Sequence, residues 1–513
     1  MRILFFRQPT GYSRPVMGFG LGIVATILKS AGHEVKVVDN NSMYYKVYSD
    51  RDLLEIIRQY KPDAIGFNIT IINAYKTYQT LAKIRNKFPG ILTVAGGIHM
   101  KYSSEEALKY GFDVVVVREG EKVVAPLFSY LSNRTRDNFR KDLEAIPGIS
   151  FIRQDGSVYA AREFPGVASL DEVPFVDYDL FNIQDFYKTG YEPLAIEICG
   201  QRGCPNRCTF CSDEIIRADR RRVSVDHLFS YLEYLYDKYK MKYMFLNDNN
   251  FLFPRERAVD FCNRLIHSGL NKEISFACQT RVDTPFDEDF ARLLKEAGFC
   301  SLGLGVERLE PYSQEAIRKK SDPAQLRHVA SIIRKAKINV TMFMVAGFPF
   351  ETVEILQAEE RAFLELADYT KTFDVSILMP LPGTIYYDNY PGVKDWYLKP
   401  EALNITFSYY GQVYDVKMLG LVKQNFYNLP REVTKELMRF IMKFKRINHR
   451  NFVVKRNPLV HIMSFADVMV AQISRVFYWI SPSLEAAVFS KVRYIRYYFA
   501  TKLFGKKISE SLD

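Results

Sequence analysis

The sequence contains no long apolar run and few cysteines. No stretch approaches the roughly 18 consecutive apolar residues that a membrane-spanning helix needs, so none is expected. The opening segment, residues 1–9, is too short and too interrupted by arginine to act as a signal peptide. Seven cysteines in 513 residues do not support a disulfide framework. Together these absences predict a cytoplasmic protein with reduced thiols.

The net charge of +11 is concentrated near the carboxyl terminus. Residues 431–513 contain 16 Lys and Arg but only 6 Asp and Glu, and the basic residues are interleaved with bulky aromatic ones. This pattern suits an amphipathic helix on an anionic membrane surface better than a nucleic-acid-binding stripe. A helical cap that buries its apolar face against the protein fits equally well. Peripheral membrane contact and an internal cap both stay open, and a nucleic-acid partner is not expected.

The first 130 residues alternate short apolar runs with helical patterns. The expected strands are residues 2–6, 34–39, 64–70, 91–95 and 114–117, and the expected helices are residues 20–32, 52–60 and 75–87. Apolar runs of this length separated by helices predict a parallel, doubly wound, Rossmann-like sheet. Ligands of such sheets bind at the carboxyl ends of the strands.

Short polar residues and glycines follow these strands. The candidate ligand contacts at the strand ends are Asn68, Thr70, Gly96, Gly97, His99, Glu119, Gly120 and Glu121. Paired glycines allow a large planar ligand to approach the backbone closely, although Gly-Gly after a strand is also a common turn. A nucleotide-binding domain is the alternative, but no Gly-x-Gly-x-x-Gly follows the first strand.

Three cysteines share one short loop. Cys204, Cys208 and Cys211 have the spacing Cys-x3-Cys-x2-Cys. An iron–sulfur cluster is normally held by four thiolates, so three leave one iron open. A zinc site usually has four ligands in paired clusters, and no second Cys-x2-Cys pair occurs in the chain. The spacing therefore favours a cluster with an open iron over zinc.

The remaining cysteines show no cluster spacing. Cys262, Cys278 and Cys300 are scattered along the chain, as buried structural thiols often are. Cys199 is close enough to the motif to be an alternative ligand or an active-site thiol. An auxiliary cluster is not expected.

With Phe210 directly before the last cysteine, the loop resembles that of the radical S-adenosylmethionine (SAM) superfamily. In that family the open iron of a 4Fe-4S cluster chelates the amino and carboxylate groups of SAM. Reduction of the cluster then cleaves SAM to a 5′-deoxyadenosyl radical. The resemblance places Phe210 near the adenine, where a hydrophobic wall keeps water from the cluster.

A second series of alternating strands and helices begins with an expected strand at residues 195–198, just before the cysteine loop. The other expected strands are residues 243–247, 275–279, 301–305, 339–345 and 374–378, with helices between them. By resemblance these form the partial (β/α)6 barrel of radical SAM enzymes, whose site lies at the carboxyl ends of the strands. The resemblance implies SAM contacts from Phe210, Asn247, Asp248, Gln279, Arg281, Glu307, Gly347 and Pro349. Asp248 would bind the methionine amino group, Arg281 its carboxylate and Glu307 the ribose hydroxyls.

The polar and glycine residues at the strand ends of the amino-terminal domain precede the cysteine motif in the chain. With this arrangement the domain resembles the cobalamin-binding domain of the cobalamin-dependent radical SAM class. A second cobalamin-binding pattern, Asp-x-His-x-x-Gly, supplies a histidine to cobalt. The chain departs from it, because Asp39 is followed by Asn40 and Asn41 and the histidine is missing. The resemblance thus implies cobalamin bound without a protein histidine on cobalt. The expected organisation is a cobalamin-binding domain over residues 1–135, a connector over 136–190, a radical SAM barrel over 191–390 and a helical substrate-capping region over 391–513.

The resemblance implies three cofactors and a function. These are a 4Fe-4S cluster, SAM and cobalamin, with an external donor of flavodoxin or ferredoxin type for the electron. The leading hypothesis is a methyltransferase that acts on an unactivated carbon of a small or lipid-like substrate. The alternative is a non-methylating member that forms a ring, rearranges or couples carbons. A cobalamin sensor without enzymatic activity is the hypothesis from another class.

Overall fold

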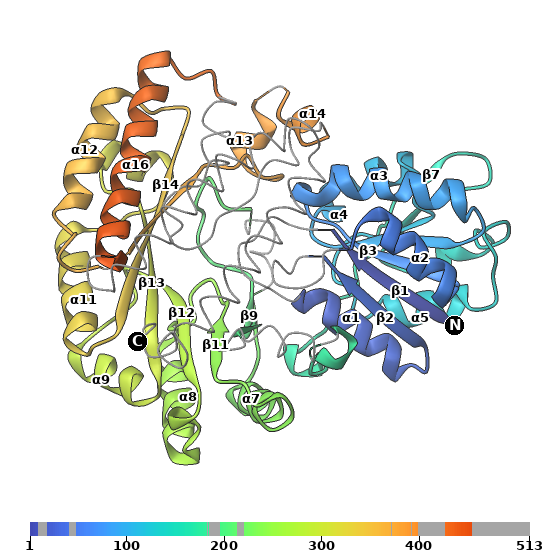
Figure 1. The fold of residues 1–513 in the computed structure, drawn as a ribbon, viewed down its shortest axis with the longest axis horizontal. Helices are drawn as coiled ribbons and strands as arrows, with labels where there is room; N and C mark the ends of the chain where they lie inside the picture. The colour runs from blue at the N-terminus through green and yellow to red at the C-terminus, as the bar shows by residue number, and fades with distance from the viewer. Residues whose placement is uncertain are drawn as a thin grey trace. The chain divides into compact units, whose positions relative to one another are not determined.

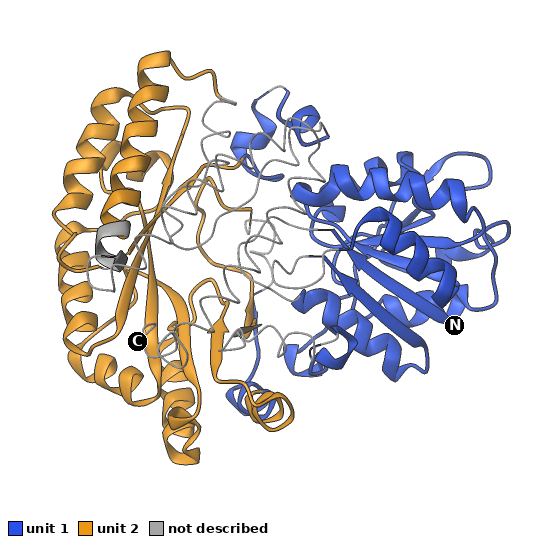
Figure 2. Cartoon of the chain, in the orientation of Figure 1, with its two compact units in different colours: residues 1–188, 218–231, 380–406 blue, residues 189–217, 232–379, 407–513 orange. Residues whose placement is uncertain are grey.

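The structure is a computed structural model. It describes residues 1–8, 18–40, 48–181, 183, 195–212, 220–370, 372–390, 392–398 and 426–453. The chain forms two compact units, coloured separately in Figure 2. Unit 1 comprises residues 1–188, 218–231 and 380–406, and unit 2 comprises residues 189–217, 232–379 and 407–513. The chain therefore enters unit 1 three times.

Unit 1 is built on a seven-stranded sheet in the order β2-β1-β3-β4-β5-β6-β7 (Figure 1). The strands are β1 Arg2–Arg7, β2 Glu34–Asp39, β3 Ala64–Asn68, β4 Leu92–Gly96, β5 Val114–Val116, β6 Ile149–Ile152 and β7 Val158–Tyr159. The helices are α1 Phe19–Ser30, α2 Asp50–Tyr60, α3 Ile71–Lys87, α4 Met100–Lys109 and α5 Val124–Leu131, with 3-10 turns at Leu143–Ala145, Leu170–Glu172 and Tyr178–Phe181. Strands β1 to β5 are parallel, which confirms the predicted sheet. Strands β6 and β7 add an antiparallel edge that the sequence did not suggest.

Successive residues of β1 face opposite sides of this sheet. Ile3 and Phe5 belong to one buried cluster, which includes Leu21 of α1. Leu4 and Phe6 belong to a second buried cluster, which includes residues of α2 and α3. A parallel sheet is covered on both faces, so its strands are apolar throughout. Each such side chain contributes about 1.5–3 kcal/mol when it is fully buried.

The end of β3 differs from the prediction. The expected strand over residues 64–70 ends at Asn68, and Ile69 N makes one more bond to the neighbouring strand, donating to Gly96 O at 2.8 Å. The following helix begins at Ile71 rather than near residue 75. Asn73 Oδ1 accepts a hydrogen bond from Thr70 N at 2.8 Å, which satisfies an amide at the start of the helix. This early start brings Thr70 to the carboxyl edge of the sheet.

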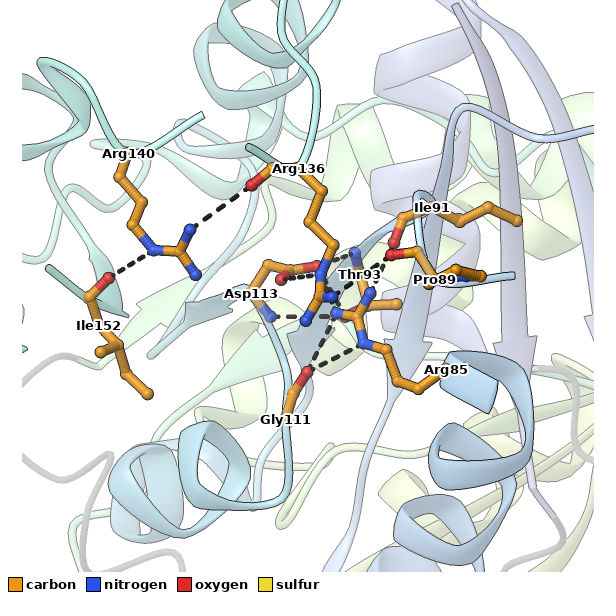
Figure 3. Close-up of polar contacts among 9 residues, drawn as sticks. All are labelled: Arg85, Pro89, Ile91, Thr93, Gly111, Asp113, Arg136, Arg140 and Ile152. Carbon is orange, nitrogen blue, oxygen red and sulfur yellow. Dashed lines mark hydrogen bonds and ion pairs between the residues drawn. The ribbon is translucent and has the colours of Figure 1, made fainter. Parts of the chain in front are cut away.

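A buried carboxylate ties the opposite edge of the sheet together (Figure 3). Asp113, just before β5, has a side chain only 2% exposed and contacts the guanidinium of Arg85 from α3. Its Oδ1 accepts from Arg136 Nε at 2.9 Å, and its Oδ2 accepts from Thr93 N at 2.8 Å. Arg85 also donates to the carbonyl of Ile91 at 2.7 Å. These contacts join the carboxyl-terminal end of α3 to the amino-terminal ends of β4 and β5, away from the predicted ligand contacts.

Residues 380–398 pack within unit 1 after the last strand of unit 2. They include α13 Ile385–Asp388 and α14 Val393–Tyr397, and α14 contacts α3. Trp396 and Tyr397 are buried. Tyr397 donates its hydroxyl hydrogen to Pro380 O at 3.0 Å, which fixes the loop that precedes α13.

Unit 2 contains a six-stranded parallel sheet in the order β15-β14-β13-β12-β11-β8. The strands are β8 Ala195–Ile198, β11 Tyr243–Leu246, β12 Ser275–Arg281, β13 Phe299–Glu307, β14 Asn339–Ala346 and β15 Thr372–Ile377. The helices include α8 Arg255–Ser268, α9 Glu288–Glu296, α10 Pro311–Ala316, α11 Pro323–Lys335, α12 Val353–Leu364 and α16 Arg431–Val453, with a 3-10 turn at Leu270–Lys272. The short strand β9 Gln201–Arg202 precedes the cysteine loop. Strand β10 Arg221–Arg222 and the first half of α7 Val225–Tyr239 belong to unit 1, and the rest of α7 belongs to unit 2. Spatial order follows chain order throughout the sheet, as predicted for an open (β/α) barrel.

Helix α16 covers the edge strand β15, and it also contacts α12 (Figure 1). Its buried face includes Leu437, Phe440 and Phe444. Asn448 donates to Phe373 O at 2.6 Å and accepts from Phe373 N at 2.8 Å, which pairs the open backbone edge of β15. This part of the basic region is therefore an amphipathic cap on its own unit. The aromatic-rich residues 454–513 lie outside the described residues.

No helix in the described part of the chain combines the length and the apolarity that a membrane span requires.

Candidate functional site

The carboxyl edge of β3 and β4 carries the glycine pair. Gly97 has a φ of +102°, and a Cβ placed on it would lie 2.5 Å from Ile69 O. His99 N donates to the same carbonyl at 3.3 Å. Among the described residues, a Cβ on Gly96 would have only Phe67 O within 4 Å, at 3.9 Å. Gly97 is therefore required by the close approach of the two loops, while Gly96 faces open space.

His99 lies beneath this edge with one ring nitrogen engaged. Its Nε2 is 3.1 Å from Glu106 Oε1, which also accepts a hydrogen bond from the Tyr78 hydroxyl at 2.8 Å. Burial and the Glu106 carboxylate raise the pKa of Tyr78, so its hydroxyl stays protonated and donates. Within the described part of the chain, His99 Nδ1 and Thr70 Oγ1 are buried atoms without a hydrogen-bond partner. Unpaired polar atoms on the segments that follow β3 and β4 fit a large, amide-rich ligand such as cobalamin.

The third predicted loop is engaged in an ion pair. Glu119 Oε1 accepts from Arg221 Nη2 at 2.6 Å, and Arg221 Nη1 donates to Val167 O at 2.8 Å. A Cβ on Gly120 would lie 3.0 Å from Val24 Cγ1, so this glycine serves the packing against α1. The other predicted contacts on this edge, Asn68 and Glu121, are both half-buried. The structure thus brings Thr70, Gly96, Gly97 and His99 together and gives Glu119 and Gly120 structural partners.

The cysteine loop in unit 2 is fixed by backbone contacts. Thr209 N donates to Ile317 O at 3.1 Å, and Cys211 N donates to Cys208 O at 3.2 Å. Cys204 Sγ accepts from Asn206 Nδ2 at 3.3 Å. Among the described residues no group of three or more His, Cys, Asp and Glu side chains is arranged as a set of metal ligands. Fit to an iron–sulfur cluster therefore rests on the donor chemistry, three thiols on one loop, and not on a preformed geometry.

Cys208 is surrounded by charged groups from the barrel. Burial raises the pKa of its thiol, while the nearby Lys319 and Arg281 act to lower it. Lys319 Nζ donates to Glu307 Oε1 at 2.9 Å, and both side chains are almost buried. A Cβ on Gly305 would lie 2.7 Å from Lys319 Nζ, so glycine is needed for the lysine to cross the strand. An ammonium has three donors, and one is used here, which leaves two for an anionic group beside the loop.

Arg281 and Asp248, the predicted contacts to methionine, both have protein partners. The Arg281 guanidinium forms two hydrogen bonds with Asp283, each of 2.8 Å. Asp248 is buried, and its Oδ1 accepts from Gly200 N at 2.6 Å. Arg257 Nη1 lies 3.9 Å from Asp248 Oδ2. Asp248 therefore holds the backbone just before the cysteine loop in the described structure. Two donors of the Arg281 guanidinium are already used by the Asp283 carboxylate.

The other barrel contacts lie at the ends of the first two inner strands. Asn247 N donates to Ile198 O at 2.8 Å, and Gln279 O accepts from Phe251 N at 3.2 Å. The first bond continues the pairing of β11 with β8, and the second ties the loop after β11 to Gln279, which lies two residues before the end of β12. Both residues therefore stand at the carboxyl edge of the sheet, as the prediction required.

The glycine turn after β14 is held by a buried ion cluster. Gly347 N donates to Glu351 Oε1 at 2.9 Å, and Arg308 Nη2 lies 2.8 Å from the same oxygen. Arg308 Nε is 3.2 Å from Glu359 Oε1, and all three side chains are at most 1% exposed. Pro349 lies two residues beyond Gly347 in this turn. These buried contacts of Arg308, Glu351 and Glu359 fix the turn that is predicted to line the adenine.

Several of these residues were missed in the sequence. Lys319, Arg308, Asp283, Glu106 and Arg221 act through partners that are distant in the chain or lie outside any motif, and no local spacing marks them. The only usable signal was indirect: Gly305 interrupts an apolar strand, which indicates a close approach by another group.

Two family models match the chain. The B12 binding domain matches residues 15–128, and the radical SAM superfamily matches residues 198–361. The first covers strands β2 to β5 of unit 1 with the glycine pair, and the second covers the cysteine loop and strands β11 to β14.

Three curated relatives illustrate what the chain is similar to. An uncharacterized methyltransferase, PH0819 of Pyrococcus horikoshii, is 30% identical over 75% of this chain and 82% of its own length. An anaerobic magnesium-protoporphyrin IX monomethyl ester cyclase of Cereibacter sphaeroides is 26% identical over 65% of this chain, which spans only 54% of that enzyme. The hopanoid C-3 methylase of Methylococcus capsulatus is 22% identical over 71% of this chain and 67% of its own length.

Solved structures share the fold at lower identity. The methyltransferase TsrM from Kitasatospora setae, with cobalamin and a [4Fe-4S] cluster bound, matches with a TM-score of 0.61 and 18% identity, over 76% of this chain and 77% of that one. The enzyme OxsB, with aqua-cobalamin and SAM bound, matches with a TM-score of 0.63 and 16% identity, over 95% of this chain and 74% of that one. A Rossmann-like cobalamin-binding domain followed by an open barrel with a three-cysteine loop defines one class of enzyme. The chain belongs to the cobalamin-dependent radical SAM enzymes, whose cofactors are cobalamin, SAM and a 4Fe-4S cluster.

Proposed function

We propose that this enzyme is a methyltransferase that adds a methyl group to an unactivated carbon of a small-molecule substrate. One observation carries the proposal: the relative with 30% identity, matched over most of both chains, is named as a methyltransferase. The two family models in one chain supply the cofactor sites that such chemistry needs. Bound there, the cluster and SAM would supply radical chemistry at a substrate carbon, and cobalamin would supply the methyl group.

The residues of the chain bind, orient and exclude water. Cys204, Cys208 and Cys211 hold the cluster as thiolates. Lys319, with two donors beside the loop, and Arg281 bind the methionine carboxylate.

The rest of SAM is held by neighbouring strand ends. Asn247, Asp248 and Gln279 receive the methionine end, and Glu307 accepts from the ribose hydroxyls. Phe210, Gly347 and Pro349 line the adenine. The turn that contains Gly347 and Pro349 is held in place by Glu351 and Arg308.

Unit 1 binds cobalamin through its carboxyl edge. Gly96 and Gly97 let the corrin approach the backbone, and His99 Nδ1 and Thr70 Oγ1 accept or donate hydrogen bonds to its amide side chains. Glu106 fixes His99 from the other side of the ring. Asn68, Glu119, Gly120 and Glu121 complete the edge. No histidine follows Asp39, whose carboxylate is bound by Arg7 at 2.7 and 2.8 Å, so we propose that cobalt has no histidine ligand from this position.

The substrate is proposed to be apolar or lipid-like. The support is the relative named as a hopanoid methylase and the basic, aromatic-rich composition of residues 454–513. We propose that residues 391–513 shape the substrate pocket and touch an anionic membrane surface. Binding to phosphatidylserine vesicles that weakens with added salt tests the membrane contact. Unchanged binding after removal of residues 454–513 refutes it.

The function is tested with the anaerobically reconstituted protein, cobalamin, SAM and a reductant. Mass spectrometry quantifies 5′-deoxyadenosine and S-adenosylhomocysteine, because radical methylation consumes two SAM molecules and forms both. Incubation with host lipid extract and methyl-labelled SAM should transfer one label to a product per turnover. The Cys208→Ser variant, which removes one cluster ligand, should form neither product.

A second candidate function is ring formation without methyl transfer. The relatives named as magnesium-protoporphyrin cyclases favour it, although this chain spans about half their length. A cyclase would form 5′-deoxyadenosine without a matching amount of S-adenosylhomocysteine. The two functions therefore separate in the same assay.

A further inference from the structure

A carboxylate of unit 1 fixes the ring of a buried histidine. Glu106 Oε1, in α4, lies 3.1 Å from His99 Nε2 and accepts a hydrogen bond from the Tyr78 hydroxyl at 2.8 Å. A carboxylate oxygen has no hydrogen to donate, so the contact requires a hydrogen on Nε2 of the imidazole. The hydrogen bond of one ring nitrogen decides which tautomer the ring adopts. Glu106 therefore selects the tautomer of His99 that carries its hydrogen on Nε2.

The other nitrogen of this ring is then an acceptor only. The His99 side chain is 2% exposed, and its Nδ1 has no hydrogen-bond partner within the described part of the chain. A doubly protonated ring would place a charged N–H at that buried position with nothing to accept its hydrogen, which costs more than an unpaired neutral acceptor. His99 Nδ1 therefore offers a lone pair and no hydrogen.

The place of His99 in the fold relates this acceptor to the ligand edge. His99 is the N-cap residue of α4, its side chain makes no capping hydrogen bond, and its amide donates to Ile69 O at 3.3 Å. Nε2, the ring nitrogen farther from the backbone, is used by Glu106 in the body of the helix. Nδ1 consequently stays near the start of α4, which follows Gly97 at the carboxyl edge of the sheet. Parallel sheets bind their ligands at that edge.

Neighbouring helices surround Glu106 with hydroxyl groups that keep their hydrogens. Tyr78 of α3 stacks on Tyr110 at 4.2 Å, with 5° between the ring planes. Burial, together with the nearby Glu106 carboxylate, raises the pKa of Tyr78, and the same two causes raise the pKa of Tyr387 in α13 to about 12. Both hydroxyls therefore stay protonated near neutral pH. Neither competes as a phenolate for the hydrogen on His99 Nε2, so the tautomer is held.

We propose that His99, positioned by Glu106, makes unit 1 selective for corrinoids whose propionamide side chains are intact. The inference deepens the proposed function and rests on its cobalamin site. A buried acceptor pairs with the N–H group of a carboxamide, but it is left facing another acceptor when a carboxylate replaces that amide. Propionamides are the longer of the two kinds of primary amide side chain on the corrin, so they reach a buried atom best. Thr70 Oγ1 does not make this distinction, because a hydroxyl donates as well as accepts.

The test compares hydroxocobalamin with its b-, d- and e-monocarboxylic acids, in each of which a single propionamide is hydrolysed to propionate. Equilibrium dialysis against the anaerobically reconstituted protein, at about pH 8 where an ordinary imidazole is neutral, gives the affinities from the corrinoid absorbance. We expect one acid to bind at least about tenfold more weakly than the other two, because its carboxylate faces His99 Nδ1. A smaller spread among the three acids would overturn the proposal, whether they all bind well or all bind poorly.

Glu106→Gln tests the positioning role. A side-chain amide donates to Nε2 as well as it accepts from it, so Nδ1 of His99 can then carry the hydrogen and meet a carboxylate, and the spread among the acids should fall below about threefold. Two controls should keep the spread: Tyr78→Phe removes the other hydrogen bond to Glu106, and Glu105→Gln removes a negative charge from an exposed neighbour. Loss of the spread in either control would reduce the effect to packing or net charge and overturn the proposal, as would an unchanged spread in Glu106→Gln.

The tautomer has a readout that needs no corrinoid. Long-range proton–nitrogen correlation spectra of protein with isotope-labelled histidine separate protonated from bare ring nitrogens, and the His99→Asn variant assigns the signals. We expect a bare Nδ1 in the parent protein and a mixture of tautomers in Glu106→Gln; a protonated Nδ1 in the parent would overturn the inference. A protein with the expected selectivity that makes no methylated product refutes the proposed function and leaves this inference intact. A protein that methylates but binds all three acids alike refutes the inference alone.

Discussion

At Gly97 the backbone leaves no room for a side chain. Because φ is positive and a Cβ would stand only 2.5 Å from Ile69 O, Gly97→Ala must shift the loop after β4. We expect a loss of about 1–3 kcal/mol in stability of this unit, from backbone strain, and at least tenfold weaker binding of hydroxocobalamin. Absorbance titration with cobalamin measures the affinity.

Gly90 provides the matched control for that substitution. It lies in an exposed turn, and no atom stands within 4 Å of its Cβ position. Gly90→Ala should change neither the stability nor the cobalamin affinity by a measurable amount. Equal affinities of the Gly97 and Gly90 variants would contradict a role of this loop in binding the corrin.

The second prediction at the residue scale concerns Lys319. Lys319→Met removes the buried ammonium, leaves Glu307 without its partner and takes away the two remaining donors near the cysteine loop. We expect SAM to bind at least tenfold more weakly, since a hydrogen-bonded charge contributes roughly 1.5–3 kcal/mol. Equilibrium dialysis with labelled SAM measures this. The exposed neighbour Lys320, changed to Met, should bind SAM like the parent.

The Arg308 cluster predicts a pH dependence. Burial raises the pKa of Glu351 and Glu359 above the ordinary 4.5, while Arg308 acts to lower it. Arg308→Met removes that compensation and should destabilise the unit by about 3–5 kcal/mol near neutral pH. A carboxyl with a raised folded-state pKa stabilises the fold most at low pH, where it is protonated in both states. That contribution is lost as the pH rises through the folded-state pKa.

The loss in the Arg308→Met variant should therefore be larger at about pH 8 than at about pH 5.5. Urea unfolding at the two pH values measures the difference. Arg327→Met, which removes an exposed ion pair with Glu365, is the control and should cost at most about 1 kcal/mol at either pH. A pH-independent loss for Arg308→Met would show that its carboxylates stay ionised without it.

Single residues mark how far sequence reasoning reached. Cys204, Cys208 and Cys211 stand out as candidate cluster ligands because their spacing is a local signal that the sequence alone shows. Gly97 could be found because strand-end glycines are typical of close backbone approach. The partners of Asp248 and Glu119, Gly200 and Arg221, could not be found, since they are distant in the chain. Asp283, the partner of Arg281, is only two residues away, but no motif marks it. The sequence therefore indicated candidate positions at the strand ends but not which of them already hold a protein partner.

At the scale of elements, α16 is the clearest test of packing. Asn448→Ala removes both hydrogen bonds to Phe373 and leaves a buried backbone donor and acceptor on the edge of β15 unpaired. We expect a loss of about 1–3 kcal/mol, the desolvation cost of such groups. Thermal unfolding of the full chain measures it, with the exposed Arg446→Ala on the same helix as control. An unchanged unfolding midpoint for Asn448→Ala would mean that water pairs this edge.

The predicted strands and helices were largely confirmed, because apolar runs and helical periodicity are local signals. The parallel sheets of both units followed from the alternation of strands and helices. The antiparallel strands β6 and β7 were not predicted, since they lie in a stretch of turns without strong periodicity. The start of α3 was wrong because the Thr70–Asn73 contact extends the helix beyond its apolar pattern.

At the scale of the whole molecule, the two units have separate sheets and separate cofactors. Asp113→Asn should destabilise unit 1 by about 3 kcal/mol, because it leaves Arg85 and Arg136 without a buried counter-charge. Hydrogen exchange followed by mass spectrometry should show faster exchange in peptides of β4 and β5 and unchanged exchange in β12 to β14. Added cobalamin should restore protection in unit 1, since a ligand stabilises the folded state that binds it. Equal loss of protection in both units would contradict independent stability.

The path of the chain between the units limits how such enzymes can be recombined. Residues 380–406 return to unit 1 after the last strand of the barrel (Figure 2). A chimaera made with one crossover between the cobalamin domain of one relative and the barrel of another would join α3 of the first to α14 of the second. The two sides of their contact would then come from different proteins, and buried side chains such as Trp396 would not be matched to their neighbours. Functional domain exchange in this lineage therefore requires the short returning segment to travel with the amino-terminal domain.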